Sequence, residues 1–340
     1  MGCTEDLGGS FRAGKIELVI ILEAYLLGID GGGSKTEAVL CRTDGCCIAR
    51  SRLPGCNPND MGFSAAAETI LTAARRTVGI HSGAVRSVCA GIGGISAGNR
   101  IVELCKHLSG IFPQAYISVR SDAEIALSNG LPAKDGCLLL AGTGVIGLVR
   151  RGKARKRFGG FGFYLDHGGS GYDFGRDVFY AVLCAAEGRG PETILTAMVE
   201  TQTGCRAAEA LDEVYRLGRP YLASFAPLAF AAATEQDPVA CDIIRRNGAE
   251  LGSILSAMMS EYETIPCPVV LSGGIFQHFT LLEPYLYSPT VPKDCVIFLR
   301  PETPPVYGAA AEAAEMFYAE DRNAAPDFRA KFLESYRTLL

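Results

Sequence analysis

The sequence has no tryptophan, and none of its thirteen cysteines forms a C-x-x-C pair. Cysteine pairs at that spacing are typical of zinc sites and redox centres, so the sequence gives no sign of either. Most of the cysteines lie instead beside Val, Leu and Ala, where a free thiol behaves as a small core residue. This usage predicts a reducing, cytoplasmic environment.

The sequence also lacks a long apolar run and a dense basic stripe. Its longest apolar stretch, 16–29, is interrupted by Glu17 and Glu23 and is shorter than the ~20 residues that a membrane-spanning helix needs. Glu5 and Asp6 stand where a signal peptide would be basic. Because the net charge is also −5, we expect neither a membrane nor a nucleic acid as a partner.

One short basic segment, 150–157, is present. Its basic residues alternate with Gly and Ala, which favours a solvated hairpin. A phosphate-binding patch is the alternative.

Two units of the same design are present in the sequence. Each has a buried strand, a glycine-containing turn and a second strand, followed by helices. The units are strands 24–29 and 37–41 around the turn 30–36, and strands 137–141 and 145–149 around the turn 142–144. A length of 340 residues predicts about two domains. We therefore expect an α/β protein made of two related halves with a cleft between them.

Other patterns complete this expected architecture. Helical spacing predicts a helix over 62–78, with Ser64 as its N-cap. Helices dominate 176–263, and 269–271 is predicted to be the last central strand. An Ala-rich helix is expected over 308–319.

The turn 30–36 reads D-G-G-G-S-K-T between two strands, so it differs from a Walker A loop, which enters a helix. Consecutive glycines let backbone N–H groups approach an anion, Ser34 and Thr36 could add hydroxyl donors, and Asp30 could hold Mg²⁺. An ordinary turn is the alternative. The recurrence of a glycine turn at 142–144 favours phosphate binding.

Eight segments, taken in order, resemble a known family. They are G-I-D-G-G-G-S-K-T, A-G-I-G-G-I-S, S-D-A, A-G-T-G, G-G-F-G, G-S-G-Y, L-S-G-G-I and G-A-A-A. Together they are similar to the N-acetylglucosamine kinase branch of the actin, Hsp70 and hexokinase superfamily, which is often grouped with the BadF/BadG/BcrA/BcrD ATPases. The likeness covers about residues 25 to 318.

The resemblance implies two actin-like (ribonuclease H-like) domains with a nucleotide cleft between them. It implies ATP and Mg²⁺ as cofactors, a small-molecule amino sugar as substrate, and a possible homodimer. The expected organisation is an unassigned extension 1–23, lobes 24–136 and 137–304, a helix 305–320 packing back on the cleft, and a tail 321–340.

The resemblance also assigns roles to individual residues. The first phosphate loop would be Gly31, Gly32, Gly33, Ser34, Lys35 and Thr36, with Asp30 at Mg²⁺, and the second would be Gly142, Thr143 and Gly144. The adenosine pocket would be lined by Ser272, Gly273, Gly274, Gly308 and Ala309. Asp122 would be the base that accepts the proton of a sugar hydroxyl, and its alternative role is an N-cap for the following helix. Asn57, Gly160 and Phe161 would contact the sugar.

The segment after Gly162 departs from the family. Where the family reads G-D-E-G-S-x-Y, this chain reads D-H-G-G-S-G-Y from Asp166. An ungapped alignment places His167 on the sugar-binding aspartate, and a one-residue insertion keeps Asp166 there. Both alignments stay open, as does the reading in which His167 only fills a loop.

Three functions are therefore compared. The first is transfer of a phosphoryl group from MgATP to a hydroxyl, expected to be O6, of N-acetylglucosamine or a related amino sugar. The second is an ATPase that activates a CoA-ester dehydratase, as other members sharing the family name do. The third is a sugar sensor in which the departure at His167 has removed turnover.

Overall fold

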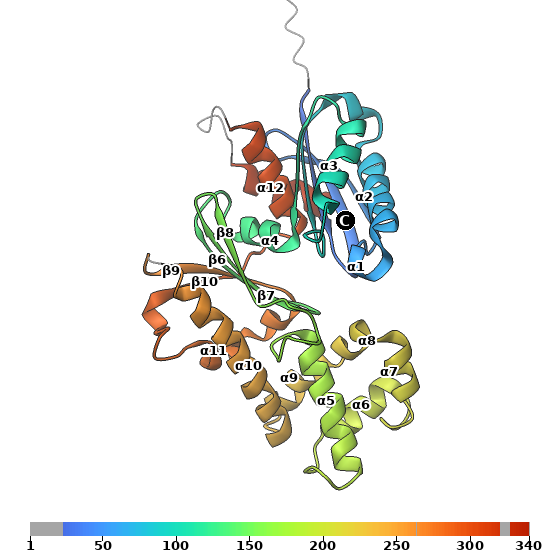
Figure 1. The fold of residues 1–340 in the computed structure, drawn as a ribbon, viewed down its shortest axis with the longest axis vertical. Coiled ribbons are helices and arrows are strands. Elements are labelled where there is room, and N and C mark those ends of the chain that lie inside the picture. Colours follow the sequence, from blue (N-terminus) through green and yellow to red (C-terminus); the bar gives the residue numbers. More distant parts are fainter. Residues whose placement is uncertain (1–22, 263, 320–326, 340) are drawn as a thin grey trace, which may run out of the picture.

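The computed structural model describes residues 23–262, 264–319 and 327–339 (Figure 1). Two five-stranded sheets organise the chain, one in each of two lobes. The first has the order β3-β2-β1-β4-β5, and the second has the order β10-β9-β6-β7-β8. In each sheet three consecutive strands pair antiparallel and two later strands add in parallel. This shared pattern confirms the expected two related actin-like halves.

The first sheet consists of β1 (Tyr25–Gly31), β2 (Lys35–Arg42), β3 (Cys47–Pro54), β4 (Val85–Ile92) and β5 (Tyr116–Ser121). The second consists of β6 (Gly136–Ala141), β7 (Val145–Arg151), β8 (Ala154–Phe158), β9 (Cys267–Ser272) and β10 (Val296–Leu299). β9 lies inside its sheet as predicted, but β10 follows it at the edge. The four residues of β10 are too few to show a clear alternation in the sequence.

Helices of the first lobe are α1 (Pro58–Met61), α2 (Phe63–Val78), α3 (Arg100–Ile111), α4 (Asp122–Gly130), α12 (Val306–Phe317) and α13 (Phe328–Thr338), with the 3₁₀ helix η1 (Gly79–Ala84). α2 and α3 pack with the first sheet in one core cluster. The predicted Ser64 cap is wrong, because α2 begins at Phe63 and Gly62 occupies the N-cap position.

The end of the chain returns to the first lobe. α12 packs between β1 and α4, where a Cβ at Gly308 would lie 1.9 Å from the Ile125 carbonyl oxygen. The expected tail contains α13, whose Phe332 and Tyr336 are buried with Val39 of β2. Because the chain crosses between the sheets after α4 and before α12, we keep 24–136 and 137–304 as the proposed limits of the lobes. The extension 1–23 lies outside the described residues except for residue 23.

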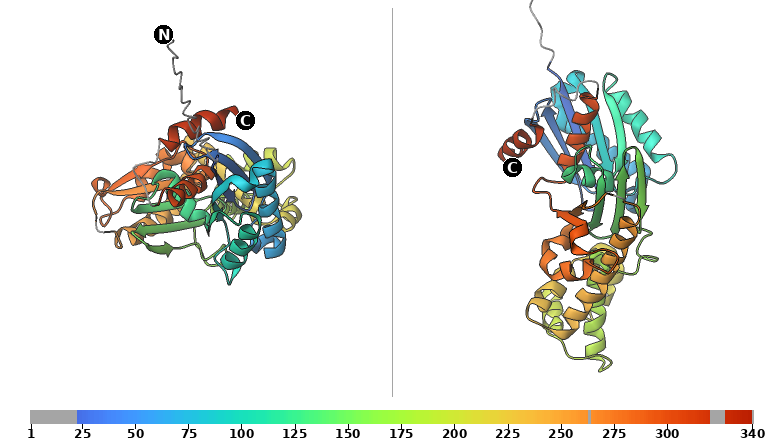
Figure 2. Two further views of the ribbon diagram at one scale, coloured as in Figure 1. Left: turned by 90° about the horizontal axis from the view of Figure 1, so that it is seen from above. Right: turned by 90° about the vertical axis from the view of Figure 1, so that its left-hand side faces the viewer.

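The second lobe is largely helical beyond its sheet (Figure 2). Its helices are α5 (Gly171–Ala186), α6 (Leu195–Thr203), α7 (Leu211–Leu217), α8 (Arg219–Ala223), α9 (Ala226–Thr234), α10 (Pro238–Met259) and α11 (Phe279–Leu286), with the 3₁₀ helices η2 (Gly274–His278) and η3 (Lys293–Cys295). One face of the second sheet shares the largest core cluster with these helices. Within the described residues, no helix is both long enough and apolar enough to span a bilayer.

α4 lies between the two lobes and packs against both (Figure 1). Ile125 on this helix is buried with Leu26 and Ala309 of the first lobe. Ala126 and Leu127, the next two residues, project from another side of the helix and are buried with Leu138 and Leu148 of the second sheet. The helix therefore delivers its first residue, Asp122, to the junction of the lobes.

Candidate active site

A cleft of about 930 Å³ separates the lobes. This volume is near the upper end of the range for small-molecule and cofactor pockets. Its lining comes from the turns after β1, β4 and β6, from the start of α4, from β8 and the loop that follows it, and from α8. Both predicted glycine turns contribute to it.

The first turn connects β1 to β2 and is closed by a hydrogen bond of 2.9 Å from the Gly32 N–H to the Lys35 carbonyl. Gly33 and Ser34 are exposed at the cleft, as phosphate binding requires. Thr36 is buried, and its hydroxyl donates to the Pro54 carbonyl at 2.8 Å, so its predicted role as a phosphate donor is wrong. The ammonium of Lys35 is 2.8 Å from a carboxylate oxygen of Glu37 and does not line the cleft.

The second turn, between β6 and β7, lines the cleft with all three of its predicted residues, Gly142, Thr143 and Gly144. The Gly142 carbonyl accepts a 2.7 Å hydrogen bond from the N–H of Gly171, the first residue of α5. The positive end of the α5 dipole therefore lies beside this turn, which favours an anion there.

The predicted adenosine segment lies next to the second turn but does not line the cleft. Ser272 pairs with Leu140 in the parallel ladder of β9 and β6. Gly273 has φ of 99°, and a Cβ there would lie 2.2 Å from the Ala141 carbonyl oxygen, so a side chain would displace the turn. Gly274 begins the 3₁₀ helix η2. The assignment of Gly308 and Ala309 to the pocket is wrong, because both are buried where α12 packs on α4 and β1.

Asp122 lines the cleft as the first residue of α4. The N-cap is Ser121, which forms a capping box with Glu124, so capping does not require the Asp122 carboxylate. One of its oxygens accepts the Ala123 N–H at 2.9 Å. Burial raises the pKa of Asp122, whereas that backbone bond and the charge of Arg157 lower it. The geometry leaves a partly desolvated carboxylate facing the space where a substrate hydroxyl could lie.

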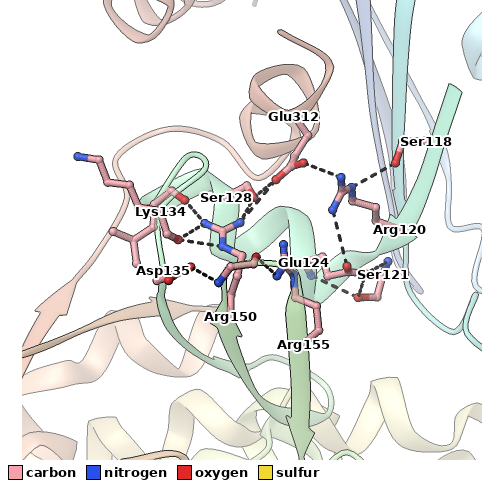
Figure 3. Close-up of polar contacts among 12 residues, drawn as sticks. Ser118, Arg120, Ser121, Glu124, Ser128, Lys134, Asp135, Arg150, Arg155 and Glu312 are labelled. Carbon is pink, nitrogen blue, oxygen red and sulfur yellow. Dashed lines mark hydrogen bonds and ion pairs between the residues drawn. The ribbon is translucent and has the colours of Figure 1, made fainter. Parts of the chain in front are cut away.

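An ion network supports β5 and α4, at whose junction Asp122 lies (Figure 3). Glu312 of α12 lies 3.1 Å from Arg120 of β5 and 3.6 Å from Arg150 of β7. Ser128 of α4 donates a hydrogen bond to Glu312 and accepts one of 2.8 Å from Arg150. Arg150 is only 4% exposed, so the expectation of a fully solvated hairpin at 150–157 is wrong at this position.

Asp30 is the second-to-last residue of β1 and lies near two other carboxylates, those of Asp122 and Glu37. Burial raises the pKa of Asp30 to about 7; the charge of Lys35 opposes this shift, and those of Asp122 and Glu37 add to it. A divalent cation beside Asp30 would offset the repulsion between its carboxylate and those of Asp122 and Glu37. Mg²⁺ commonly binds one or two protein carboxylates together with substrate phosphates. Asp30 itself is not among the residues that line the cleft, so its role at Mg²⁺ stays a prediction. Among the described residues, no group of three or more His, Cys, Asp or Glu could hold a metal without such phosphates.

The expected sugar-contacting residues divide into two groups. Asn57 and Gly160 line the cleft. Phe161 is 71% exposed and lies outside the lining, where Phe163 takes part instead. The predicted sugar contact of Phe161 therefore lacks support from the cleft lining, and Phe163 is the aromatic residue that lies there.

The structure also separates the two alignments of the D-H-G-G segment. Asp166 lines the cleft and accepts hydrogen bonds from the backbone N–H groups of Phe161 at 3.1 Å and Gly162 at 2.9 Å. His167 is exposed and is not part of the lining. The arrangement favours the alignment in which Asp166 is the sugar ligand.

Comparison with known proteins agrees with this geometry. The profile of the BadF/BadG/BcrA/BcrD ATPase family matches residues 27–313. The chain belongs to this family. Among its relatives, an N-acetylmuramic acid/N-acetylglucosamine kinase of Clostridium acetobutylicum is 27% identical over 276 residues, covering 78% of this chain and 88% of that protein. An N-acetyl-D-glucosamine kinase of Dictyostelium discoideum is also 27% identical, over 76% of this chain and 88% of that protein.

The fold is shared with a solved structure from Chromobacterium violaceum that is provisionally assigned as an N-acetylglucosamine kinase. It superposes with a TM-score of 0.68 at 23% identity, over 86% of this chain and 99% of that one. At this identity the likeness establishes the actin-like architecture.

Several cleft residues of this family member were not singled out from the sequence. Asp60 and Arg219 line the cleft and meet across it, 3.2 Å apart, although they are far apart along the chain. Arg219 also lies over the ring of Phe163, 4.9 Å from its centroid. Arg155 and Arg157 of β8 line the cleft as well. The sequence signal that could have identified these two arginines was the basic segment 150–157, for which a phosphate-binding patch was the alternative interpretation.

Proposed function

We propose that this protein is an ATP-dependent kinase that phosphorylates a hydroxyl, O6, of N-acetylglucosamine or a related amino sugar. One observation carries the proposal: a single cleft brings together both glycine turns and the carboxylate of Asp122. The names of the curated relatives support the substrate class. The twelve free cysteines in the described part of the chain support a cytoplasmic setting for the reaction.

In the proposed reaction Asp122 accepts the proton of the sugar hydroxyl. The hydroxyl oxygen forms a bond to the γ-phosphorus of ATP while the bond from that phosphorus to the β,γ-bridging oxygen breaks, and ADP leaves. Backbone N–H groups of Gly33, Ser34, Thr143 and Gly144 would hold the phosphates, because those of Gly32 and Gly142 already donate within their own turns. Asp30 would hold Mg²⁺, which when bound supplies charge neutralisation at the phosphate oxygens.

The sugar would lie against the other wall of the cleft. Asn57 and Asp166 offer hydrogen-bonding groups, and Phe163 offers an aromatic face. The ion pair between Asp60 and Arg219 bridges the lobes at this wall. Closure of the lobes around both substrates would exclude water, which Asp122 could otherwise activate for ATP hydrolysis.

The test is ADP release measured with MgATP and a panel of N-acetylglucosamine, N-acetylmuramic acid, N-acetylmannosamine, glucosamine, glucose and no sugar. Release that depends on an amino sugar is expected. Inactivity of 6-deoxy-N-acetylglucosamine, together with binding of this analogue, would place transfer at O6. Sugar-independent ATP turnover would indicate the dehydratase-activating ATPase instead, and sugar binding without turnover would indicate the sensor.

A further inference from the structure

β8 directs two arginines toward the helix that carries Asp122. In the antiparallel pair of β7 and β8, Arg157 lies opposite Leu148 and Arg155 lies opposite Arg150. Directly opposed residues of an antiparallel pair project from the same face of the sheet. Leu148 packs against α4, so Arg157 projects toward α4 as well. Lys156, between them, projects from the other face and pairs with Glu261 at 2.5 Å.

The charge of Arg157 is not neutralised by a carboxylate. Three arginines line the cleft: Arg155, Arg157 and Arg219. Arg219 is paired with Asp60, whereas neither arginine of β8 has an ion pair among the residues that the structure describes. Cationic side chains that line a cleft without a partner are suited to bind an anion there.

The guanidinium of Arg157 is held in place but keeps free donors. Its Nε donates to the Gly159 carbonyl at 3.0 Å, and Nη2 donates to the Gly160 carbonyl. Its Nη1 makes no hydrogen bond within residues 23–262, 264–319 and 327–339. Both anchoring carbonyls belong to the loop after β8, part of which lines the cleft, so the cation is held on that side of the cleft.

We propose that Arg157 stabilises the negative charge of the phosphoryl group during its transfer to the sugar. The inference rests on the proposed kinase function. In that reaction the acceptor hydroxyl lies between the Asp122 carboxylate and the γ-phosphorus, so a cation directed at Asp122 also reaches the transferring group. A guanidinium placed there is suited to phosphate oxygens, because its planar N–H groups match their geometry. The field of Arg157 at Asp122, which lowers the pKa of that carboxyl, agrees with this proximity.

A purely structural role, in which Arg157 only fixes Gly159 and Gly160, predicts different kinetics. Losing a loop anchor would weaken sugar binding and raise the KM for sugar. Losing charge stabilisation in the transition state lowers kcat with little change in either KM. The split between kcat and KM therefore separates the two roles.

The experiment compares Arg157→Met, Arg157→Lys and Lys156→Met with the wild type in the sugar-dependent ADP assay. Arg157→Met removes the charge and keeps the length of the side chain, and it should lower kcat about 100- to 1000-fold, as for loss of a charge-stabilising donor. The KM for ATP should stay within about threefold, and a rise in the KM for sugar would report the loss of the two hydrogen bonds to the loop. Arg157→Lys keeps the positive charge, so its kcat should be at least tenfold higher than that of Arg157→Met. Lys156→Met removes a charge from the other face of the same strand and should keep wild-type kcat.

The outcomes distinguish this inference from the proposed function. If the wild type releases ADP with an amino sugar but Arg157→Met keeps its kcat or raises only the KM for sugar, the role of Arg157 is rejected and the kinase stands. Equal loss in Arg157→Met and Arg157→Lys would also reject a role for charge. A wild type without sugar-dependent turnover would reject the kinase itself. Equal thermal midpoints of the variants would show that the substitutions leave folding intact.

Discussion

Replacing Glu312 tests the buried network between the lobes (Figure 3). Glu312 lies 3.1 Å from Arg120 and 3.6 Å from Arg150, and the side chain of Arg150 is only 5% exposed. Removing one partner of a buried ion pair destabilises a protein by about 3–5 kcal/mol, since the remaining charge stays buried. Arg120 keeps a second carboxylate, Glu124, at 3.9 Å, so we expect the lower end, about 3 kcal/mol, for Glu312→Ala.

The free energy of unfolding is measured by urea denaturation at pH 7. Glu312→Gln keeps a hydrogen-bonding group for Ser128 but removes the charge, so a loss of about 1–2 kcal/mol is expected. Glu315→Gln is the matched control on the same helix: Glu315 is half-buried and has no ion pair within the described residues, so its loss should stay below about 0.5 kcal/mol. A loss below about 1 kcal/mol for Glu312→Ala, with an unchanged denaturant slope, would refute the reasoning.

Further predictions concern the cleft. Asp122→Ala should abolish sugar phosphorylation while the circular dichroism spectrum stays unchanged, and retained turnover would reject Asp122 as the base. The pKa of Asp30 rises to about 7 on folding, so its neutral form favours the folded state; this contribution is complete below about pH 4 and is lost as the pH rises through 7. In EDTA, Asp30→Asn should therefore exceed the wild type in unfolding free energy by about 2–4 kcal/mol at pH 8 and by little at pH 4, and equal pH profiles in urea melts would contradict this. Asp166→Asn should raise the KM for sugar at least tenfold and His167→Asp should leave it within twofold, whereas the reverse order would restore the ungapped alignment. Gly273→Ala should weaken ATP binding in calorimetry, because its Cβ would displace the second turn, and wild-type affinity would show that the turn tolerates it.

The duplicated sheet pattern was predictable because local signals determine it. A buried strand, a glycine turn and a return strand are adjacent in the chain, so periodicity and turn residues indicate them together. Recurrence of the glycine turn indicated Gly142 to Gly144 as a second phosphate loop, whereas the role of Asp122 was implied only by the family resemblance. The burial of Thr36 was not predictable from these local signals. Its side chain lies on the inner face of β2, where its hydroxyl donates a hydrogen bond to the Pro54 carbonyl.

The remaining errors concern long-range packing. Gly308 and Ala309 are small because α12 approaches α4 and β1 closely, and a motif alone does not distinguish a backbone contact from a ligand contact. The roles of Arg150 and Arg157 depend on which face of the β7–β8 hairpin meets α4. That partner is separated from them in the chain and comes close only through the fold.

The position of α4 makes the carboxylate of Asp122 sensitive to any rotation between the lobes. Ile125 ties this helix to the first sheet, and Leu127 ties it to the second. When two bodies rotate about a helix wedged between them, the end of that helix is displaced relative to at least one of them. Binding of either substrate that turns one lobe would thus shift the distance from Asp122 to the opposite wall. The position of the Asp122 carboxylate would therefore depend on the angle between the lobes.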